Sequence, residues 1–135
     1  MMDAVEYGRT LQGLTLNLIV RDVARSVPFY TEALGFAVVH QTGDYAALER
    51  DGAKIQLHAD HTYRRTHWAA DLATGIRRGL GAEVRLFGLA PEAVERAALQ
   101  YGSVLLTTGE RAGHGWRDVV VADPDGYTFA AGVSL

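Results

Sequence analysis

The stretch VRDVARSVPFYTEALGF, residues 20–36, decides the fold of this chain, and the rest of the sequence is organised around it. Just before it, leucine and valine alternate with other side chains over residues 14–20, which predicts a strand. Inside it, apolar side chains recur at helical spacing from Val23 to Leu34, which predicts a helix with one buried face. Gly35 follows at once and suits a left-handed residue that ends the helix.

Pro28 sets the expected start of that helix. Because proline is tolerated only near the first turn, regular helix is expected to begin close to Ser26. Further along, Asp51 and Gly52 separate two strand-like segments and form a strong hairpin signal. Three strands are therefore expected after the helix, over residues 36–41, 45–49 and 54–58. The first half is thus predicted to be a βαβββ module.

The second half repeats the landmarks of the first. Gly102 corresponds to Gly35, and Asp125-Gly126 corresponds to Asp51-Gly52, at an offset of roughly seventy residues that indicates a duplicated module. Gly102 is expected to end its helix as Gly35 does. The expected elements are a strand at 83–87, a helix from Pro91 with Ala93, Val94, Ala97 and Tyr101 as its apolar stripe, and strands at 103–106, 117–122 and 127–133.

The sequence therefore predicts an α+β fold built from two tandem βαβββ modules. One domain is expected over residues 1–135, with module one at about 12–60, a connector at about 61–81 and module two at about 82–133. The connector is expected to hold a short helix around Trp68–Leu72.

Composition excludes several functional classes. The chain has 135 residues, 48% of them hydrophobic and 21% charged, which is typical of a globular protein rather than a disordered one. The formal charge of −3 argues against nucleic acid or an anionic membrane as the partner. The absence of cysteine excludes a disulfide, a thiolate metal site and a cysteine nucleophile. No signal peptide or membrane span is recognised, so a cytoplasmic location is expected.

Two segments resemble the paired signatures of the vicinal-oxygen-chelate superfamily, which includes glyoxalase I, extradiol dioxygenases, fosfomycin-resistance enzymes and bleomycin-resistance proteins. They are VRDVARSVPFYTEALGF (20–36) and VVVADPDGYTF (119–129), and the resemblance covers about residues 14–133. It implies that the two modules form a curved mixed sheet with a concave cleft and with helices outside. Alternation on several strands supports a mixed polar face that lines this cleft.

The resemblance also addresses metal binding. Metal-dependent members place His or Gln, and Glu, at four cleft positions, which correspond here to Thr15, Gln56, Glu83 and Ala130. Because alanine offers no ligand and threonine is a poor one, no metal ligands, catalytic residues or cofactor are expected. A relocated site made of His58, His61 and Glu83 stays open as an alternative.

Aromatic side chains are the better site candidates, because a ring face stacks on a flat ligand with little geometric demand. In the bleomycin-resistance branch, tryptophans lie near the positions of Tyr45 and Trp116. Packing in the core is the competing explanation for Trp68 and Trp116. The residues expected to contact a ligand are Thr15, Tyr45, Gln56, His58, Trp68, Glu83, His114 and Trp116.

The function expected from these features is metal-independent binding and sequestration of a small aromatic or peptide-like drug, of the glyoxalase/bleomycin-resistance type. A role in antibiotic resistance and a homodimer are implied by the resemblance. The alternatives are a divalent-metal lyase, isomerase or dioxygenase of the same superfamily, a metal-free catalyst with Glu83 or His58 as base, and a partner-binding domain.

Overall fold

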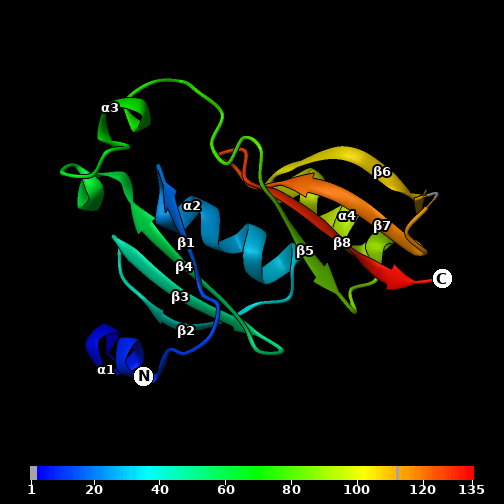
Figure 1. Cartoon of the computed structure of the whole chain (residues 1–135), viewed down its shortest axis with the longest axis horizontal. Coiled ribbons are helices and arrows are strands. Elements are labelled where there is room, and N and C mark those ends of the chain that lie inside the picture. Colours follow the sequence, from blue (N-terminus) through cyan, green and yellow to red (C-terminus); the bar gives the residue numbers. More distant parts are fainter. Residues whose placement is uncertain (1–2, 112) are drawn as a thin grey trace. The chain divides into compact units, whose positions relative to one another are not determined.

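The computed structural model describes residues 3–111 and 113–135, which form an α+β protein with two four-stranded mixed sheets (Figure 1). The chain divides into two compact units. The first comprises the residues up to Val27 together with Phe36–Ile76, and the second comprises Pro28–Gly35 and Arg77–Leu135. Each unit holds one sheet.

The first sheet has the strand order β1-β4-β3-β2, with β1 parallel to β4 and the other pairs antiparallel. Its strands are β1 Leu16–Val20, β2 Ala37–Gln41, β3 Tyr45–Arg50 and β4 Ala53–Ala59. Asp51 and Gly52 have φ values of 46° and 82°, so the β3–β4 hairpin closes through a turn with two left-handed residues. This confirms the predicted hairpin.

The second sheet has the order β5-β8-β7-β6, with β5 parallel to β8 and the other pairs antiparallel. Its strands are β5 Glu83–Phe87, β6 Ser103–Arg111, β7 Trp116–Ala122 and β8 Thr128–Ser134. Order and pairing repeat those of the first sheet strand for strand, which confirms two tandem βαβββ modules.

The helical segments are short, and among the described residues no helix is long and apolar enough to span a membrane. They are α1 Ala4–Thr10, α2 Val23–Pro28, the π-helical turn η1 Phe29–Ala33, the 3₁₀ turn η2 Asp60–Tyr63, α3 Ala69–Leu72 and α4 Pro91–Tyr101. The short helix expected in the connector is confirmed by α3.

The prediction that regular helix begins close to Ser26 is wrong. The α2 helix begins at Val23, where the side chain of Asp22 accepts a hydrogen bond from the N–H of Arg25 at 3.1 Å. Pro28 lies at the end of α2, and the chain continues directly into the wider π-helical turn η1. Because proline has no N–H, the helix changes its hydrogen-bonding pattern at this point rather than starting anew.

The two helix-ending glycines have different roles. Gly35 has φ 71°, as a left-handed cap requires, but Gly102 has φ −158°, so the predicted equivalence is wrong. Gly102 is required for space: a Cβ there would lie 2.2 Å from the carbonyl oxygen of Ala122 and 2.7 Å from Cδ1 of Phe29. A tertiary contact, rather than the helix end itself, selects glycine.

The core of the second unit is aromatic. The rings of Phe29, Tyr30 and Phe129 contact one another at centroid distances of 5.2 to 5.8 Å. The α4 helix packs on η1 and on β7. Its buried face consists of Pro91, Val94 and Ala98, whereas Ala93 is exposed and Ala97 and Tyr101 are only half-buried. The buried face is therefore rotated around the helix relative to the predicted stripe, because packing against η1 determines which face of α4 is buried.

The turn between β7 and β8 is held by a buried carboxylate. One oxygen of Asp123 accepts the backbone N–H groups of Asp125 and Tyr127, both at 2.9 Å. The other oxygen accepts the hydroxyl of Tyr30 at 2.7 Å. Burial raises the pKa of Asp123 to about 6. The second Asp-Gly signal is thus a turn, with Gly126 at φ 102°, but side-chain hydrogen bonds define it.

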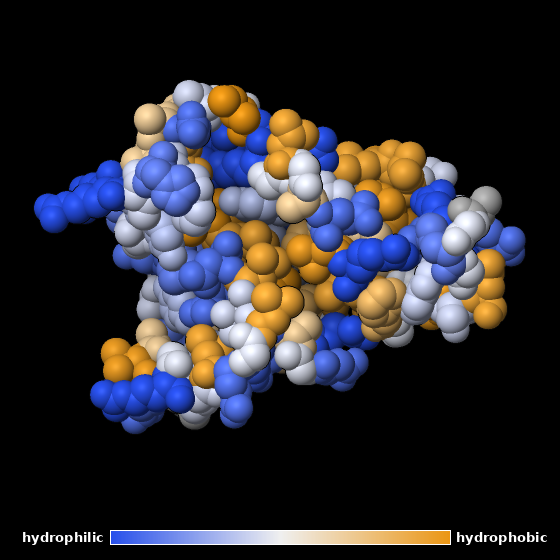
Figure 2. All heavy atoms as spheres, in the orientation of Figure 1, coloured by the Kyte–Doolittle hydropathy of each residue, from blue (hydrophilic) through white to orange (hydrophobic). Residues whose placement is uncertain are grey.

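β6 forms one edge of the second sheet and exposes apolar side chains. Leu105 and Leu106 are 42% and 55% exposed, and hydrophobic residues gather over this strand in Figure 2.

Candidate functional site

One face of the first sheet carries most of its polar side chains because alternation sends most of the large apolar side chains to the opposite face. On β4, Ile55 and Leu57 are buried, whereas Gln56 and His58 point to the polar face. The β3–β4 register places Tyr45 opposite His58, and Ala47 opposite Gln56. Polar groups from two adjacent strands therefore meet on this face.

A continuous series of rings crosses this face and is called the ring series below. Tyr45 contacts His58 at a centroid distance of 5.1 Å, and His58 contacts Tyr63 at 5.2 Å. Tyr63 of η2 then stacks on Trp68 at 5.9 Å with an interplanar angle of 27°. Trp68 is 42% exposed, so the series runs from the sheet out to solvent.

Side-chain amides accompany the rings. The hydroxyl of Tyr45 donates to Oε1 of Gln56 at 2.5 Å, and Nδ2 of Asn17 donates to the hydroxyl of Tyr63 at 3.4 Å. Asn17 is also the cross-strand partner of Gln56 in the parallel β1–β4 pair. The amides thus fix the orientation of both tyrosines.

The middle of this face is uncharged at neutral pH. Burial lowers the pKa of His58, so its imidazole is neutral, and burial raises the pKa of Tyr45, so its hydroxyl keeps its proton. Nε2 of His58 is buried and has no hydrogen-bond partner among the described residues. The site is aromatic and dipolar rather than ionic.

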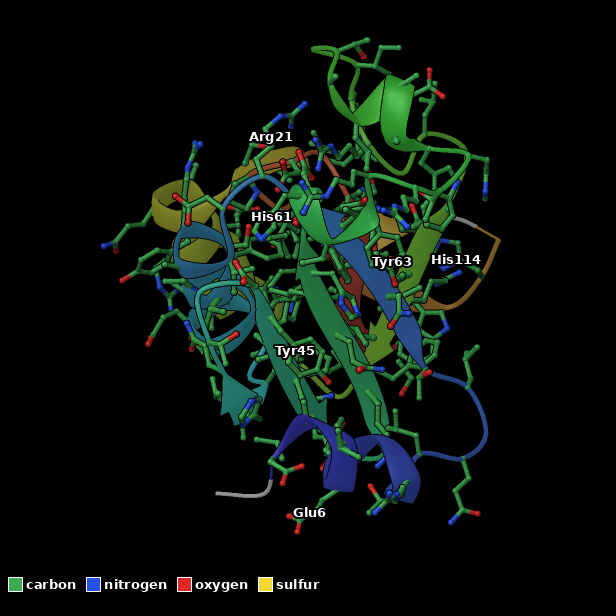
Figure 3. All side chains as sticks on the ribbon, turned by 90° about the vertical axis from the view of Figure 1, so that its left-hand side faces the viewer. Glu6, Arg21, Tyr45, His61, Tyr63 and His114 are labelled. Atoms are coloured by element: carbon green, nitrogen blue, oxygen red, sulfur yellow. The ribbon has the colours of Figure 1, made fainter. Side chains whose placement is uncertain are left out.

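Both ends of this face are occupied by other elements of the same unit. At one end the hydroxyl of Tyr7 on α1 donates to Glu49 at 3.0 Å, and Glu49 pairs with Lys54 at 2.9 Å. Figure 3 shows Tyr45 on the sheet, with α1 beyond one end and the turn bearing His61 and Tyr63 at the other. The charges at the α1 end satisfy each other, which leaves the ring series as the distinctive feature.

The second sheet also has a mixed face, with a different chemistry. The ring of Trp116 on β7 lies 4.3 Å from that of Phe87 on β5. Beside them, Asp118 is buried and forms ion pairs with Arg111 at 2.8 Å and with Arg85 at 3.9 Å. This face combines aromatic rings with guanidinium groups.

Within the first unit, the structure brings together four residues of the predicted ligand-binding set. Tyr45, Gln56, His58 and Trp68 join in the first unit through the ring series, and Thr15 precedes β1 in the same unit. Three more residues belong to the second unit: Trp116 in its ring pair, Glu83 exposed at the start of β5, and His114 exposed between β6 and β7.

The four positions that the resemblance assigns to a metal do not provide a suitable donor set. Ala130 has no donor atom, and Oε1 of Gln56 is already engaged by the hydroxyl of Tyr45. Asn17, rather than Thr15, is the partner of Gln56. Within residues 3–111 and 113–135, no group of three His, Asp or Glu side chains is arranged to hold a metal ion. A single carboxylate, Glu83, does not match the several N or O ligands that a divalent ion needs.

The expected set of ligand-contacting residues leaves out several whose role depends on contacts between distant parts of the chain. Tyr63 lies in the connector and Asn17 on β1, and the two meet only in the folded unit. Arg85 and Asp118 lie on strands separated by β8 in the second sheet. Alternation along β1 and β5 was the available signal, since it places Asn17 and Arg85 on the polar faces.

Comparison with known proteins places the chain in a family. The family model described as Glyoxalase/Bleomycin resistance protein/Dioxygenase superfamily matches residues 13–131, while no curated protein matches the chain. One similar solved structure is a glyoxalase-related enzyme from Fulvimarina pelagi, with 20% identity over 92% of this chain and 89% of that one and a TM-score of 0.71. A second is a glyoxalase/bleomycin resistance protein/dioxygenase family enzyme from Burkholderia phytofirmans PsJN, with 20% identity over 90% of this chain and 97% of that one and a TM-score of 0.70. A third is a protein of unknown function from Agrobacterium tumefaciens str. C58, with 25% identity over 94% of this chain and 99% of that one and a TM-score of 0.66. The match over residues 13–131, together with the duplicated βαβββ sheets, establishes that the chain belongs to the glyoxalase/bleomycin resistance protein/dioxygenase superfamily.

Proposed function

We propose that this protein binds a small, flat, uncharged aromatic molecule on the polar face of the first sheet, without a metal ion, and sequesters it. The observation that carries this proposal is the ring series, in which each of Tyr45, His58, Tyr63 and Trp68 contacts the next. A planar ligand adds to such a series by stacking on the exposed part of Trp68, which is 42% exposed and also contacts the ring of His67 at 4.6 Å.

The polar groups of the site define the ligand further. His58 is neutral and Tyr45 keeps its proton, so the middle of the face offers no charge to attract an ion. Oε1 of Gln56 is occupied, which leaves its amide N–H groups as donors beside the rings. A carbonyl or ring heteroatom at the edge of the ligand would accept them. The ligand class is therefore a neutral heteroaromatic or aryl carbonyl compound.

Sequestration is favoured over turnover because the donor set does not suit the metal ion on which lyases and dioxygenases of this superfamily depend. Such a protein would act stoichiometrically, by keeping a drug-like compound from its target. We further propose that it works as a homodimer in the cytoplasm, with the apolar edge strand β6 as a surface that a second copy could cover. Analytical ultracentrifugation tests the dimer independently of binding.

The binding experiment uses the fact that the chain contains two tryptophans, Trp68 and Trp116. In a Trp116→Phe background, Trp68 is the single fluorescent reporter. Coumarin, which is flat and neutral, is expected to quench Trp68 saturably, whereas the non-planar octahydrocoumarin is not. Ligand-observed NMR repeats the comparison without optical interference.

Variants then test the assignment to the ring series. Replacing Tyr63 by Leu removes the ring beneath Trp68 and is expected to weaken coumarin binding by about fivefold, the value of one aromatic contact. The matched control Tyr101→Leu changes a half-buried tyrosine of the other unit and is expected to leave binding unchanged. Equal binding of coumarin and octahydrocoumarin, or equal effects of the two variants, would contradict the proposal.

A further inference from the structure

The face of the second sheet carries an aromatic pair that is partly open to solvent. Phe87 is 52% exposed and the ring of Trp116 lies 4.3 Å from it. Both residues stand on the mixed face, since Phe87 follows Arg85 at the strand spacing of two, and Trp116 precedes Asp118 in the same way. An exposed phenylalanine surface on a polar face is a candidate contact for a ligand.

A guanidinium group stands next to this pair. The guanidinium carbon of Arg85 lies over the Phe87 ring, 5.9 Å from its centre, and the Arg85 side chain is 38% exposed. Its ion pair with Asp118 is long, at 3.9 Å, whereas Arg111 approaches the same carboxylate to 2.8 Å. Arg111 is therefore the main partner that neutralises the charge of the buried Asp118 carboxylate. Arg85 keeps N–H groups that can reach a second anion.

We propose that this face binds a small molecule that combines a flat ring with a carboxylate or a similar anionic group. The ring stacks on Phe87 beside Trp116, and the anionic group receives hydrogen bonds from Arg85. Glu83 lies on the far side of Arg85 from Phe87 along β5, so it does not oppose an anion that approaches over the ring. At the Phe87 end of this face, Arg85 and Arg111 stand beside one buried aspartate, Asp118, which favours an anionic ligand there.

This inference is independent of the proposed function, which concerns uncharged ligands in the first unit. The reporter is also different: in a Trp68→Phe background, Trp116 is the single tryptophan. The probes are naphthoate and its uncharged amide, naphthamide, which share one ring system and differ in charge. Naphthoate is expected to quench Trp116 saturably and to bind more tightly than naphthamide.

Arg85→Gln is the decisive variant, because it keeps a polar side chain and removes the charge at a partly exposed position. It is expected to weaken naphthoate binding by about tenfold and to leave naphthamide binding unchanged, as loss of a charged hydrogen bond requires. Arg96→Gln, an exposed arginine on α4, is the charge-matched control and is expected to change neither. Phe87→Leu is expected to weaken both probes.

Three results would overturn the inference: no saturable quenching of Trp116 by naphthoate, equal losses for naphthoate in Arg85→Gln and Arg96→Gln, or equal losses for naphthoate and naphthamide in Arg85→Gln. None of them bears on coumarin binding reported by Trp68. Failure of this site and failure of the proposed function are therefore distinguishable.

Discussion

Tyr30→Phe is expected to destabilise the protein in a strongly pH-dependent way. Tyr30 is 0% exposed and its hydroxyl donates to Asp123, itself 3% exposed, at 2.7 Å. At about pH 8 the carboxylate is ionised, and a hydrogen bond to a buried charge contributes about 2 kcal/mol to stability. At about pH 5 most Asp123 is protonated, and the loss is expected to fall to about 1 kcal/mol, the value of a neutral hydrogen bond.

The sign follows from the direction of the pKa change. Burial raises the pKa of Asp123 from 3.8 to about 6, so the folded state holds this proton more tightly than the unfolded state does. Its contribution to stability is therefore complete below about pH 4 and is lost as the pH rises through about 6, an effect of about 3 kcal/mol. The Tyr30 hydrogen bond opposes this loss by stabilising the ionised carboxylate.

Urea unfolding of the wild-type and Tyr30→Phe proteins at about pH 8 and about pH 5 measures the difference in their free energies of unfolding. The slope of this free energy with urea concentration is compared between the two proteins, to ensure that unfolding exposes the same surface in both. Tyr101→Phe serves as the control, since it removes a hydroxyl from a half-buried tyrosine of the same unit. An equal loss for Tyr30→Phe at both pH values, or a larger loss at the lower one, would refute the reasoning.

Three further predictions concern the fold, the site and the metal. Gly102→Ala is expected to lower the free energy of unfolding in urea by about 3 kcal/mol, because the new Cβ would clash with backbone. The control Gly43→Ala is expected to have little effect, because a Cβ there meets nothing within 4 Å. Equal effects of the two substitutions would contradict the steric argument. An NMR titration is expected to give His58 a pKa below 6.5. Protonation of His58 therefore disfavours the folded state, and the stability that this group contributes falls as the pH drops below about 6.5. A titration midpoint above 6.5 would contradict a buried, neutral imidazole. Excess Fe²⁺, Mn²⁺, Ni²⁺, Co²⁺ or Zn²⁺ is expected to leave the Tm of metal-stripped protein unchanged; a saturable rise of several degrees that Glu83→Ala abolishes would establish a metal site instead.

Local signals determined most of the secondary structure. The Asp51-Gly52 hairpin, the cap at Gly35 and the helix start at Pro91 each depend on the backbone preferences of one or two residues, and each was predictable. The repeat of the Asp-Gly signal at 51–52 and 125–126 also indicated a duplicated module, and the two sheets share one strand order. Alternation on the strands was sufficient to place Gln56 and His58 on a polar face.

Other features depended on contacts that no local pattern encodes. The face of α4 that is buried follows from packing on η1, and glycine at position 102 follows from the approach of Ala122 and Phe29. The hydrogen bond from Tyr30 to Asp123 joins residues 93 positions apart in the sequence. Such pairs are invisible in periodicity, because periodicity reports the face of a residue and not the residue that it meets.

The sequence by itself therefore determined the family, the βαβββ repeat and the candidate residue types. Only the tertiary structure decided that Tyr45, His58, Tyr63 and Trp68 form one ring series, and that Arg85 stands beside Phe87 and Asp118. The physical reason is that alternation along a strand determines only the face of the sheet to which each side chain points. Strand order and register then bring side chains from different strands and from the connector to within contact distance.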